Sequence, residues 1–184
     1  MEPVFTMQYG EFVVADYFSK RIKDASVFVP ASAQEKGIDL LMYRFNNGNK
    51  TCTIQVKMSR TYYKTRKRIP VTLPYDLWFN RFPIQGNADW YVLVGIYAKR
   101  PSNTNTSSKG ISWDSIMLAF THDEMVQFMA DVKKKKNPQE DDRMFGFSFD
   151  DSKQIFQTRG YKTRRDMTSY LIDNRLTEIQ KSFK

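Results

Sequence analysis

The segment from residue 37 to residue 60, GIDLLMYRFNNGNKTCTIQVKMSR, constrains the fold more than any other part of the chain. Two mainly apolar and β-branched runs, 38–43 and 51–57, flank a turn sequence around Asn47-Gly48. Because Asn-Gly readily adopts the positive φ angles of a tight turn, the pattern predicts a β-hairpin. The apolar character of both runs predicts that the hairpin lies in the interior of a sheet.

Two charged residues, Asp39 and Lys57, interrupt these apolar runs. An unpaired charge is costly to bury, so each of them needs a partner or a function. Antiparallel pairing places Asp39 at the same end of the hairpin as Gln55 and Lys57. The two-residue spacing then puts Gln55 and Lys57 on one face of their strand. The sequence therefore predicts that an acid, an amide and an ammonium group meet at one place.

The pattern Gly-Ile-Asp, a hairpin and then Gln-Val-Lys resembles the core of the PD-(D/E)XK nuclease superfamily, which includes restriction endonucleases and Holliday-junction resolvases. The resemblance implies that Asp39 and Gln55 bind a divalent metal and that Lys57 assists the attacking water. The chain departs from the pattern at two positions. Ile38 replaces the proline, and Gln55 replaces the acid of the triplet, a variant known in the superfamily.

A helix is predicted from about Thr6 to Asp24, with one apolar stripe formed by Val14, Ala15, Phe18 and Ile22. Glu11 falls on the same stripe. A structural glutamate near the start of a helix is the simplest interpretation, since the helix dipole favours an acid there. The resemblance implies instead that Glu11 is the additional acid that many superfamily members direct into the metal site, where it would offset the charge missing at Gln55.

The resemblance implies an α/β (α+β) fold of the restriction-endonuclease type, with a three-layer core in which helices flank a central mixed sheet. We expect a single domain over residues 1–184, with the core at about 6–133 and a C-terminal extension of strands and a helix at about 144–184. The aromatic-rich segment 70–83 is predicted to be loop-like and to fill the core, with a lid or a dimer contact as alternatives. Further strands are expected at 26–30, 89–97 and 111–120.

The chain is basic, with a net charge of +9 and a pI of about 9.6, which favours a polyanionic partner. Two segments concentrate this charge, 59–68 and 157–165. We predict that they bind nucleic acid, with DNA as the first choice, through phosphate contacts and stacked bases; solvated basic loops are the alternative. The predicted nucleic-acid-binding residues are Ser59, Arg60, Tyr62, Lys64, Arg66, Lys67, Arg68, Arg159, Lys162, Arg164 and Arg165.

The predicted function is hydrolysis of DNA phosphodiester bonds by a Mg²⁺-dependent endonuclease, with Mn²⁺ as an alternative ion. The predicted catalytic residues are Glu11, Asp39, Gln55 and Lys57, and the predicted metal ligands are Asp39, Gln55, the Val56 carbonyl and Glu11. Two other classes remain open. One is a nuclease-like domain that binds nucleic acid without cutting it. The other is an interaction domain in which Asp39 and Lys57 form a buried ion pair.

The single Cys52 and the single His122 exclude a zinc site built from cysteine and histidine. One cysteine also excludes an intrachain disulfide and is typical of a reducing compartment. His122 follows Thr121 in a predicted helix-capping box that ends at Glu124, a position where a surface histidine is expected. No apolar run reaches transmembrane length, and the N-terminus lacks the apolar core of a signal peptide. These features predict a cytoplasmic protein. A homodimer is an open alternative that the sequence does not decide.

Overall fold

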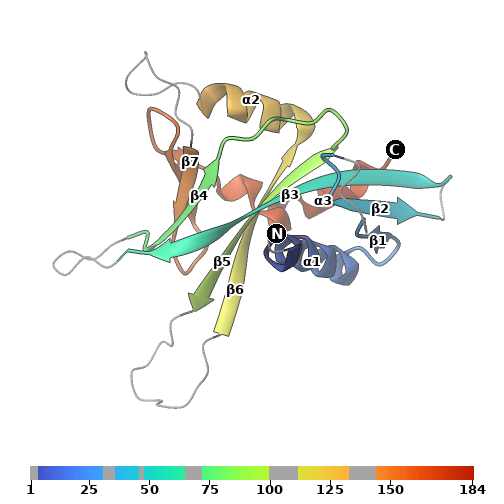
Figure 1. Cartoon of the computed structure of the whole chain (residues 1–184), viewed down its shortest axis with the longest axis horizontal. Helices are drawn as coiled ribbons and strands as arrows, with labels where there is room; N and C mark the ends of the chain where they lie inside the picture. Colours follow the sequence, from blue (N-terminus) through green and yellow to red (C-terminus); the bar gives the residue numbers. More distant parts are fainter. Residues whose placement is uncertain (1–3, 31–35, 46–47, 65–71, 100–111, 133–143) are drawn as a thin grey trace.

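The computed structural model describes residues 4–30, 36–45, 48–64, 72–99, 112–132 and 144–184. Their elements are, in chain order, α1 (Val4–Arg21), β1 (Ser26–Phe28), β2 (Leu40–Arg44), β3 (Lys50–Tyr63), β4 (Tyr75–Asn80), β5 (Trp90–Lys99), β6 (Ser112–Thr121), α2 (His122–Val132), β7 (Met144–Phe149), β8 (Ile155–Arg159), β9 (Arg165–Asp166), a 3-10 helix (Thr168–Tyr170) and α3 (Ile172–Lys181). All of these strands belong to one sheet, and the long strand β3 crosses its centre (Figure 1).

The predicted hairpin is confirmed. β2 and β3 pair antiparallel, with Leu40 opposite Ile54 and Arg44 opposite Lys50. Gly48 has a φ of 87°, the positive angle expected in this turn, while residues 46–47 lie outside the described part of the chain. β3 continues well past the expected end of its apolar run and stops only at Tyr63.

The two edges of β3 have different neighbours. One edge pairs in parallel with β5 over residues 54–60. The backbone N–H groups of Val56 and Lys64 both point to the other edge, because they are an even number of residues apart in one strand. The first bonds to Asp39, just before β2, and the second to Pro74, just before β4. β2 and β4 therefore share this edge.

A gap separates β2 from β4 on that shared edge. In the described residues, β2 pairs with β3 as far as Ile54, and β4 begins to pair at Thr61. Residues 55–60 of β3 lie between the two strands, and we call this stretch the β3 gap. The predicted catalytic residues of the hairpin lie at its start.

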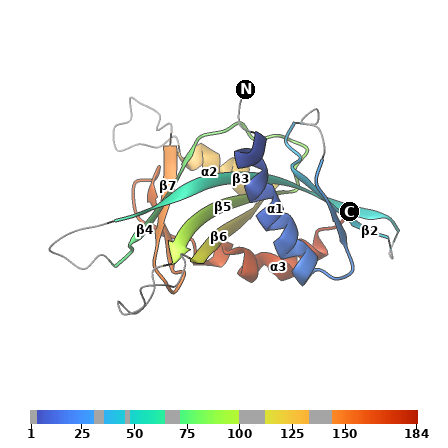
Figure 2. The ribbon, with the colours of Figure 1, turned by 60° about the horizontal axis from the view of Figure 1, so that its bottom comes forward.

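The two faces of the sheet pack against different cores. Helices α1 and α3 pack on one face of β3, β5 and β6 (Figure 2). On the other face the sheet curls back, so that β4, β7 and α2 pack on β5 and β6. Gly95 in β5 permits this approach, because a Cβ there would lie 2.8 Å from the side chain of Leu77 in β4. The sheet therefore supplies much of its own second layer.

The expected three-layer core with a central mixed sheet flanked by helices is wrong. Among the described residues every strand pair is antiparallel except β3 with β5. The reason lies in the segment 70–83, which was expected to be loop-like but forms β4. In β4 every second side chain is buried in the core, namely Tyr75, Leu77 and Phe79. β4 also pairs with β7, so strands occupy the place of a helical layer.

Three expectations about helices can be compared with the structure. The first helix is confirmed, and its predicted stripe, including Val14 and Phe18, is buried. The capping box is confirmed, since the Thr121 N–H donates to Glu124 Oε2 at 2.8 Å and the Glu124 N–H to Thr121 Oγ1 at 3.3 Å. The helix expected in the C-terminal extension is α3, which begins at Ile172, after β9 and the 3-10 helix. None of the helices in the described residues is long and apolar enough to cross a membrane.

Candidate metal and nucleic-acid site

Asp39 is anchored to β3 at the start of the β3 gap. Its N–H donates to the Ile54 carbonyl at 2.9 Å, and its Oδ2 accepts the Val56 N–H at 2.7 Å. The carboxylate thus continues the pairing that β2 has begun, and it remains partly exposed. Because the N–H and C=O of one extended residue point to the same edge, the Val56 carbonyl also points to the edge that β2 and β4 share.

The loop that delivers Asp39 is fixed by a glycine. Gly37 has a φ of 94°, and a Cβ there would lie 2.5 Å from both the Gln85 Cβ and the Asn87 Oδ1. The Asn87 amide also donates to the Lys36 carbonyl at 2.7 Å. A side chain at position 37 would both strain the backbone and displace this loop.

Gln55 is buried and has an unsatisfied oxygen. Its side chain is 5% exposed, and its Oε1 has no hydrogen-bond partner among the described residues. Extending the hairpin register from Leu40 and Ile54 by one residue places Gln55 opposite Asp39. A buried acceptor without a partner costs about 1–3 kcal/mol, so this oxygen is suited to a ligand that the described residues do not supply.

Glu11 on α1 lies close enough to the hairpin to interact electrostatically with its charged residues. The preceding residue, Gly10, lies so close to β3 that a Cβ on it would be 2.8 Å from the Met58 Cβ. Burial raises the pKa of Glu11 above its ordinary value of 4.5, nearby Asp39 raises this pKa further, and Lys57 lowers it in part. The pKa of Glu11 therefore responds to both charged residues of the hairpin. Two carboxylates at one site would favour a proton or a cation between them.

Lys57 is partly exposed, and its ammonium group lies 5.6 Å from the centre of the Phe82 ring. Among the described residues no ion pair within 4.0 Å joins it to Asp39. The buried ion pair required by the interaction-domain alternative is therefore not formed. The ammonium group is available to an anionic ligand at the β3 gap.

The candidate metal-ligand atoms at the β3 gap are all oxygens. Within the described residues no three His, Cys, Asp or Glu side chains form a cluster that could hold a metal. The candidate set instead combines two carboxylates, Glu11 and Asp39, with the Gln55 amide oxygen and the Val56 carbonyl. Hard oxygen donors of this kind suit Mg²⁺ or Mn²⁺ rather than Zn²⁺. The residues present therefore fit the ion that the resemblance implies.

A pocket of about 440 Å³ adjoins the β3 gap, and we call it the aromatic pocket. Its lining consists of Lys57, Met58, Ser59, Tyr62, Trp78, Phe79, Asn80, Arg81, Phe82 and Met144. Sequence reasoning missed this pocket because it did not recognise β4. The alternation of Tyr75, Leu77 and Phe79 was the available signal, since it places the intervening Trp78 on the opposite face.

The first basic segment is only partly available to a nucleic acid. Arg60 and Tyr62 are exposed, whereas the Ser59 hydroxyl donates to the Trp78 carbonyl. Lys64 is engaged, because its ammonium group lies 2.6 Å from the Asp76 carboxylate. The predicted residues Arg66, Lys67 and Arg68 lie outside the described part of the chain.

The second basic segment lies on β8, β9 and the turn between them. Arg159, Lys162 and Arg164 are exposed, and the Arg164 guanidinium lies 3.7 Å from the centre of the Phe156 ring. Arg165 has a structural role, since it pairs with Asp131 at 3.2 Å. Arg159 is the member nearest in register to the aromatic pocket: it is opposite Gly146, which is opposite Trp78.

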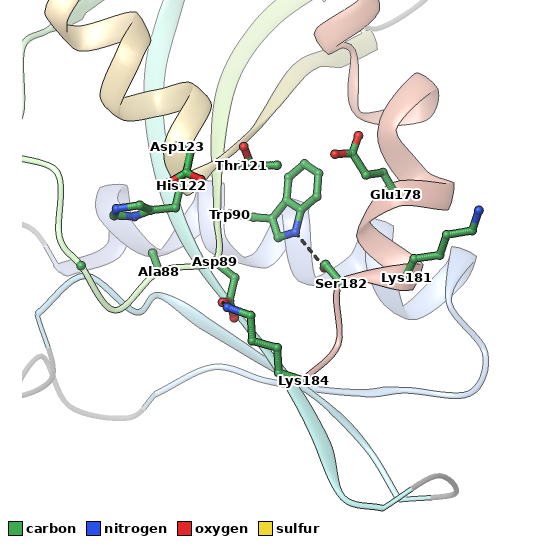
Figure 3. A pocket seen from close by; sticks show the side chains of 11 residues that line it. Ala88, Asp89, Trp90, Thr121, His122, Asp123, Glu178, Lys181, Ser182 and Lys184 are labelled. Carbon is green, nitrogen blue, oxygen red and sulfur yellow. Dashed lines mark hydrogen bonds and ion pairs between the residues drawn. The ribbon is translucent and has the colours of Figure 1, made fainter.

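A second pocket, of about 490 Å³, surrounds Trp90 at the start of β5 (Figure 3). The Trp90 indole donates to the Ser182 hydroxyl at 2.8 Å, and the Lys184 ammonium group lies 2.7 Å from the Asp89 carboxylate. None of the described residues that line this pocket belongs to the predicted catalytic set. Its contacts attach the C-terminal segment to the sheet, so we assign it a structural role.

No protein-family model matches the sequence, and neither the curated proteins nor the solved structures that were compared give a match.

Proposed function

We propose that this chain is a Mg²⁺-dependent nuclease that hydrolyses DNA phosphodiester bonds at the β3 gap. The observation that carries the proposal is the Asp39 carboxylate, which is anchored to β3 by the Val56 N–H, opposite the buried and unsatisfied Gln55 in register and electrostatically coupled to Glu11. Two like charges and an unpartnered acceptor each favour a cation at the same place. The resemblance of the hairpin to the PD-(D/E)XK core supports the same interpretation.

The ion would be held by the Asp39 carboxylate, the Gln55 amide oxygen and the Val56 carbonyl, with Glu11 binding directly or through water. When bound, a divalent ion polarises the phosphate and lowers the pKa of water. Asp39 is already oriented for this task by its bond to the Val56 N–H. Mn²⁺ shares the preference for oxygen ligands and is the proposed alternative.

Lys57 would act on the phosphate rather than on the metal. Its ammonium group, which has no ion pair with Asp39, can donate to a phosphate oxygen or to the attacking water. In the reaction the water oxygen forms a bond to phosphorus, the ester bond to the leaving oxygen breaks, and that oxygen takes a proton from solvent water. Burial raises the pKa of Glu11, so this carboxylate would be suited to accept the proton of the water.

One observation favours a second candidate, a domain that binds nucleic acid without cutting it. Gln55 is neutral where the superfamily usually has an acid, so the site has one negative charge less for a cation. The exposed cations and the aromatic pocket would serve such a domain equally well. Metal dependence separates the two functions, because only the nuclease requires an ion at the β3 gap.

The test is cleavage of single-stranded and duplex DNA with Mg²⁺, Mn²⁺ or EDTA. We expect cutting with either ion, none in EDTA, and none for Asp39→Asn. Asp16→Asn is the matched control, because Asp16 is an exposed carboxylate on α1 that pairs only locally with Lys20 at 2.7 Å. Cutting that persists in Asp39→Asn would contradict the assignment, and DNA binding without any metal-dependent cutting would favour the second candidate.

We also propose a cytoplasmic location. Cys52 is fully buried, and burial raises the pKa of its thiol to about 11. The thiol therefore stays protonated and unreactive. The proposed location rests on the use of a single, free cysteine, which is typical of a reducing compartment. Formation of a homodimer remains a prediction.

A further inference from the structure

We propose that the aromatic pocket binds one unpaired nucleobase of the substrate, next to the phosphate held at the β3 gap. The position of that phosphate rests on the proposed function. The base pocket itself rests on independent features, namely a stacked aromatic pair, a close backbone support beneath it and a lining that holds two cations. Together they define the substrate class as single-stranded nucleic acid, or a duplex with an unpaired nucleotide.

The aromatic pair consists of Tyr62 on β3 and Trp78 on β4. Their ring centres are 5.3 Å apart and their planes are inclined by 28°, so the rings are stacked. Tyr62 is 52% exposed, so part of its ring is open to a ligand. Exposed rings on strands are the surfaces on which proteins stack unpaired bases, and such stacking tolerates any base.

The Trp78 ring packs against the backbone of the neighbouring strand at a glycine. A Cβ on Gly146 of β7 would lie 2.3 Å from Trp78 Cδ1, so the indole lies directly over the backbone of β7. Any other residue at 146 would displace the ring. The platform is therefore fixed before a ligand arrives, which lowers the ordering cost of binding.

The charge of the lining indicates an anionic ligand. Lys57 and Arg81 line the pocket, and none of the described residues in its lining is acidic. Asn80, which is exposed, adds an amide that can both donate to and accept from the edge of a base. Aromatic rings combined with cations fit a nucleotide, whereas an apolar peptide would gain nothing from the cations.

Lys57 belongs to both the pocket and the candidate catalytic set. A base in the pocket and a phosphate at the β3 gap would thus share one ammonium group and belong to neighbouring positions of one strand. A paired base cannot enter such a pocket without leaving its stack, and extrusion is least costly where the base is already unpaired. This is why the pocket selects for an unpaired nucleotide.

The test measures binding in EDTA with the full chain, so that no cutting can occur. The probes are a labelled single-stranded oligonucleotide, the same sequence as a duplex, and that duplex with one bulged nucleotide. We expect the single strand and the bulged duplex to bind more tightly than the perfect duplex. Binding of the bulged duplex as tightly as the single strand would assign the pocket to an extruded base. Tighter binding of the single strand than of both duplexes would restrict the pocket to bases of single-stranded nucleic acid.

Tryptophan fluorescence gives a direct reading of the pocket. The chain has three tryptophans, of which Trp90 is 1% exposed and Trp113 is 66% exposed. In a Trp113→Phe background the response to a ligand therefore comes mainly from Trp78. We expect the single strand to quench this emission, because a base stacked beside the Tyr62–Trp78 pair alters the surroundings of the indole.

Substitution of Tyr62 provides the matched comparison. Tyr62→Ala removes one stacking surface and should weaken single-strand binding about tenfold. Tyr62→Phe keeps the ring and should bind like the parent protein. Phe45→Ala removes another exposed ring, 76% exposed and outside the pocket, and should have no effect. All of these changes are at exposed positions, so circular dichroism should confirm that each variant folds.

Equal affinity for the single strand and the perfect duplex, with no quenching of Trp78 and no effect of Tyr62→Ala, would overturn the inference. This result is distinguishable from failure of the proposed function. A protein that cuts DNA but shows no base binding would keep the nuclease and lose the pocket. A protein that binds the unpaired base but never cuts would keep the pocket and lose the nuclease.

Discussion

Gly10 on α1 and Met58 on β3 approach so closely that a Cβ on the glycine would lie 2.8 Å from the Met58 Cβ. This contact lies one residue from Glu11 and one residue from Lys57. It therefore brings the first half of α1 against the β3 gap, where Glu11 senses the charges of Asp39 and Lys57. The geometry of the candidate site depends on this approach between two residues that have no catalytic group.

Gly10→Ala should test that dependence. In an unconstrained helix interior alanine is about 1 kcal/mol more stable than glycine. We expect the opposite here, because the added methyl group would push α1 away from β3. Thermal unfolding should show a lower Tm and a smaller stabilisation by Mg²⁺. Ser19→Ala, at an exposed position of α1, is the control and should show neither effect. A higher Tm with unchanged Mg²⁺ stabilisation would contradict the role of this contact.

Glu11→Gln should change the pH dependence of stability. The folded protein raises the pKa of Glu11 above its ordinary 4.5, mainly by burial and then by Asp39. The folded state therefore binds the proton more tightly than the unfolded state. The resulting stability is fully present below the unfolded pKa and is lost as the pH rises through the raised pKa. Without metal, the variant should thus gain in Tm relative to the parent protein as the pH rises through this range.

The same variant should respond less to metal. Glutamine removes one negative charge from the β3 gap, so the Tm increase produced by Mg²⁺ should be smaller than in the parent protein. The two effects have opposite signs, which distinguishes them from general damage to the fold. Parallel pH profiles for the two proteins, in the absence of metal, would show that Glu11 is not perturbed.

Lys57→Met separates catalysis from stability. Lys57 forms no ion pair with Asp39 and is partly exposed, so its loss should change the free energy of unfolding by less than about 1 kcal/mol. A buried pair would instead lose about 3–5 kcal/mol when one partner is removed. Cutting should fall about 10²- to 10³-fold, because a group that stabilises charge on the phosphate is lost. Urea unfolding and cleavage rates measure the two quantities, and a loss of stability comparable to a buried pair would support the interaction-domain alternative.

Arg60 and Lys64 should differ in their effect on DNA binding, although both lie in the first basic segment. Arg60 is exposed, and Arg60→Ala should weaken binding at every sequence and lower the salt slope by about 1. Lys64 is held by Asp76 at 2.6 Å and by the Ser148 hydroxyl at 3.2 Å. Lys64→Ala should therefore lower the Tm and leave the salt slope unchanged. Equal salt slopes in the two variants would show that the ion pair opens when DNA binds.

Local pattern was enough to predict the hairpin and the first helix. The turn residues, the apolar periodicity and the two charges inside apolar runs all act over short distances in the sequence. The register that places Gln55 opposite Asp39 followed from antiparallel pairing alone. The meeting of the Asp39, Gln55 and Lys57 side chains stays a prediction. Glu11 was placed at the site only by the resemblance, and its proximity to Asp39 appears in the perturbation of its pKa.

The curled second layer could not be predicted from local pattern. β4 lies between prolines at 70, 74 and 83, which favoured a loop, and its partner β7 is far away in sequence. Pairing of this kind depends on a core that forms only when Leu77 meets Gly95 across the sheet. The aromatic pocket was missed for the same reason, since Tyr62 and Trp78 come together only through the pairing of β3 with β4.

Metal-dependent thermal unfolding tests the central claim most directly. The Tm of the parent protein should rise with Mg²⁺ or Mn²⁺ concentration, and at 100 times the Kd the ion should add about 2.7 kcal/mol of stability. Asp39→Asn should abolish this rise, while Gln55→Glu, which restores a charged ligand of the same length, should keep or increase it. A Tm that does not respond to either ion in the parent protein or in Gln55→Glu would contradict a metal site at the β3 gap.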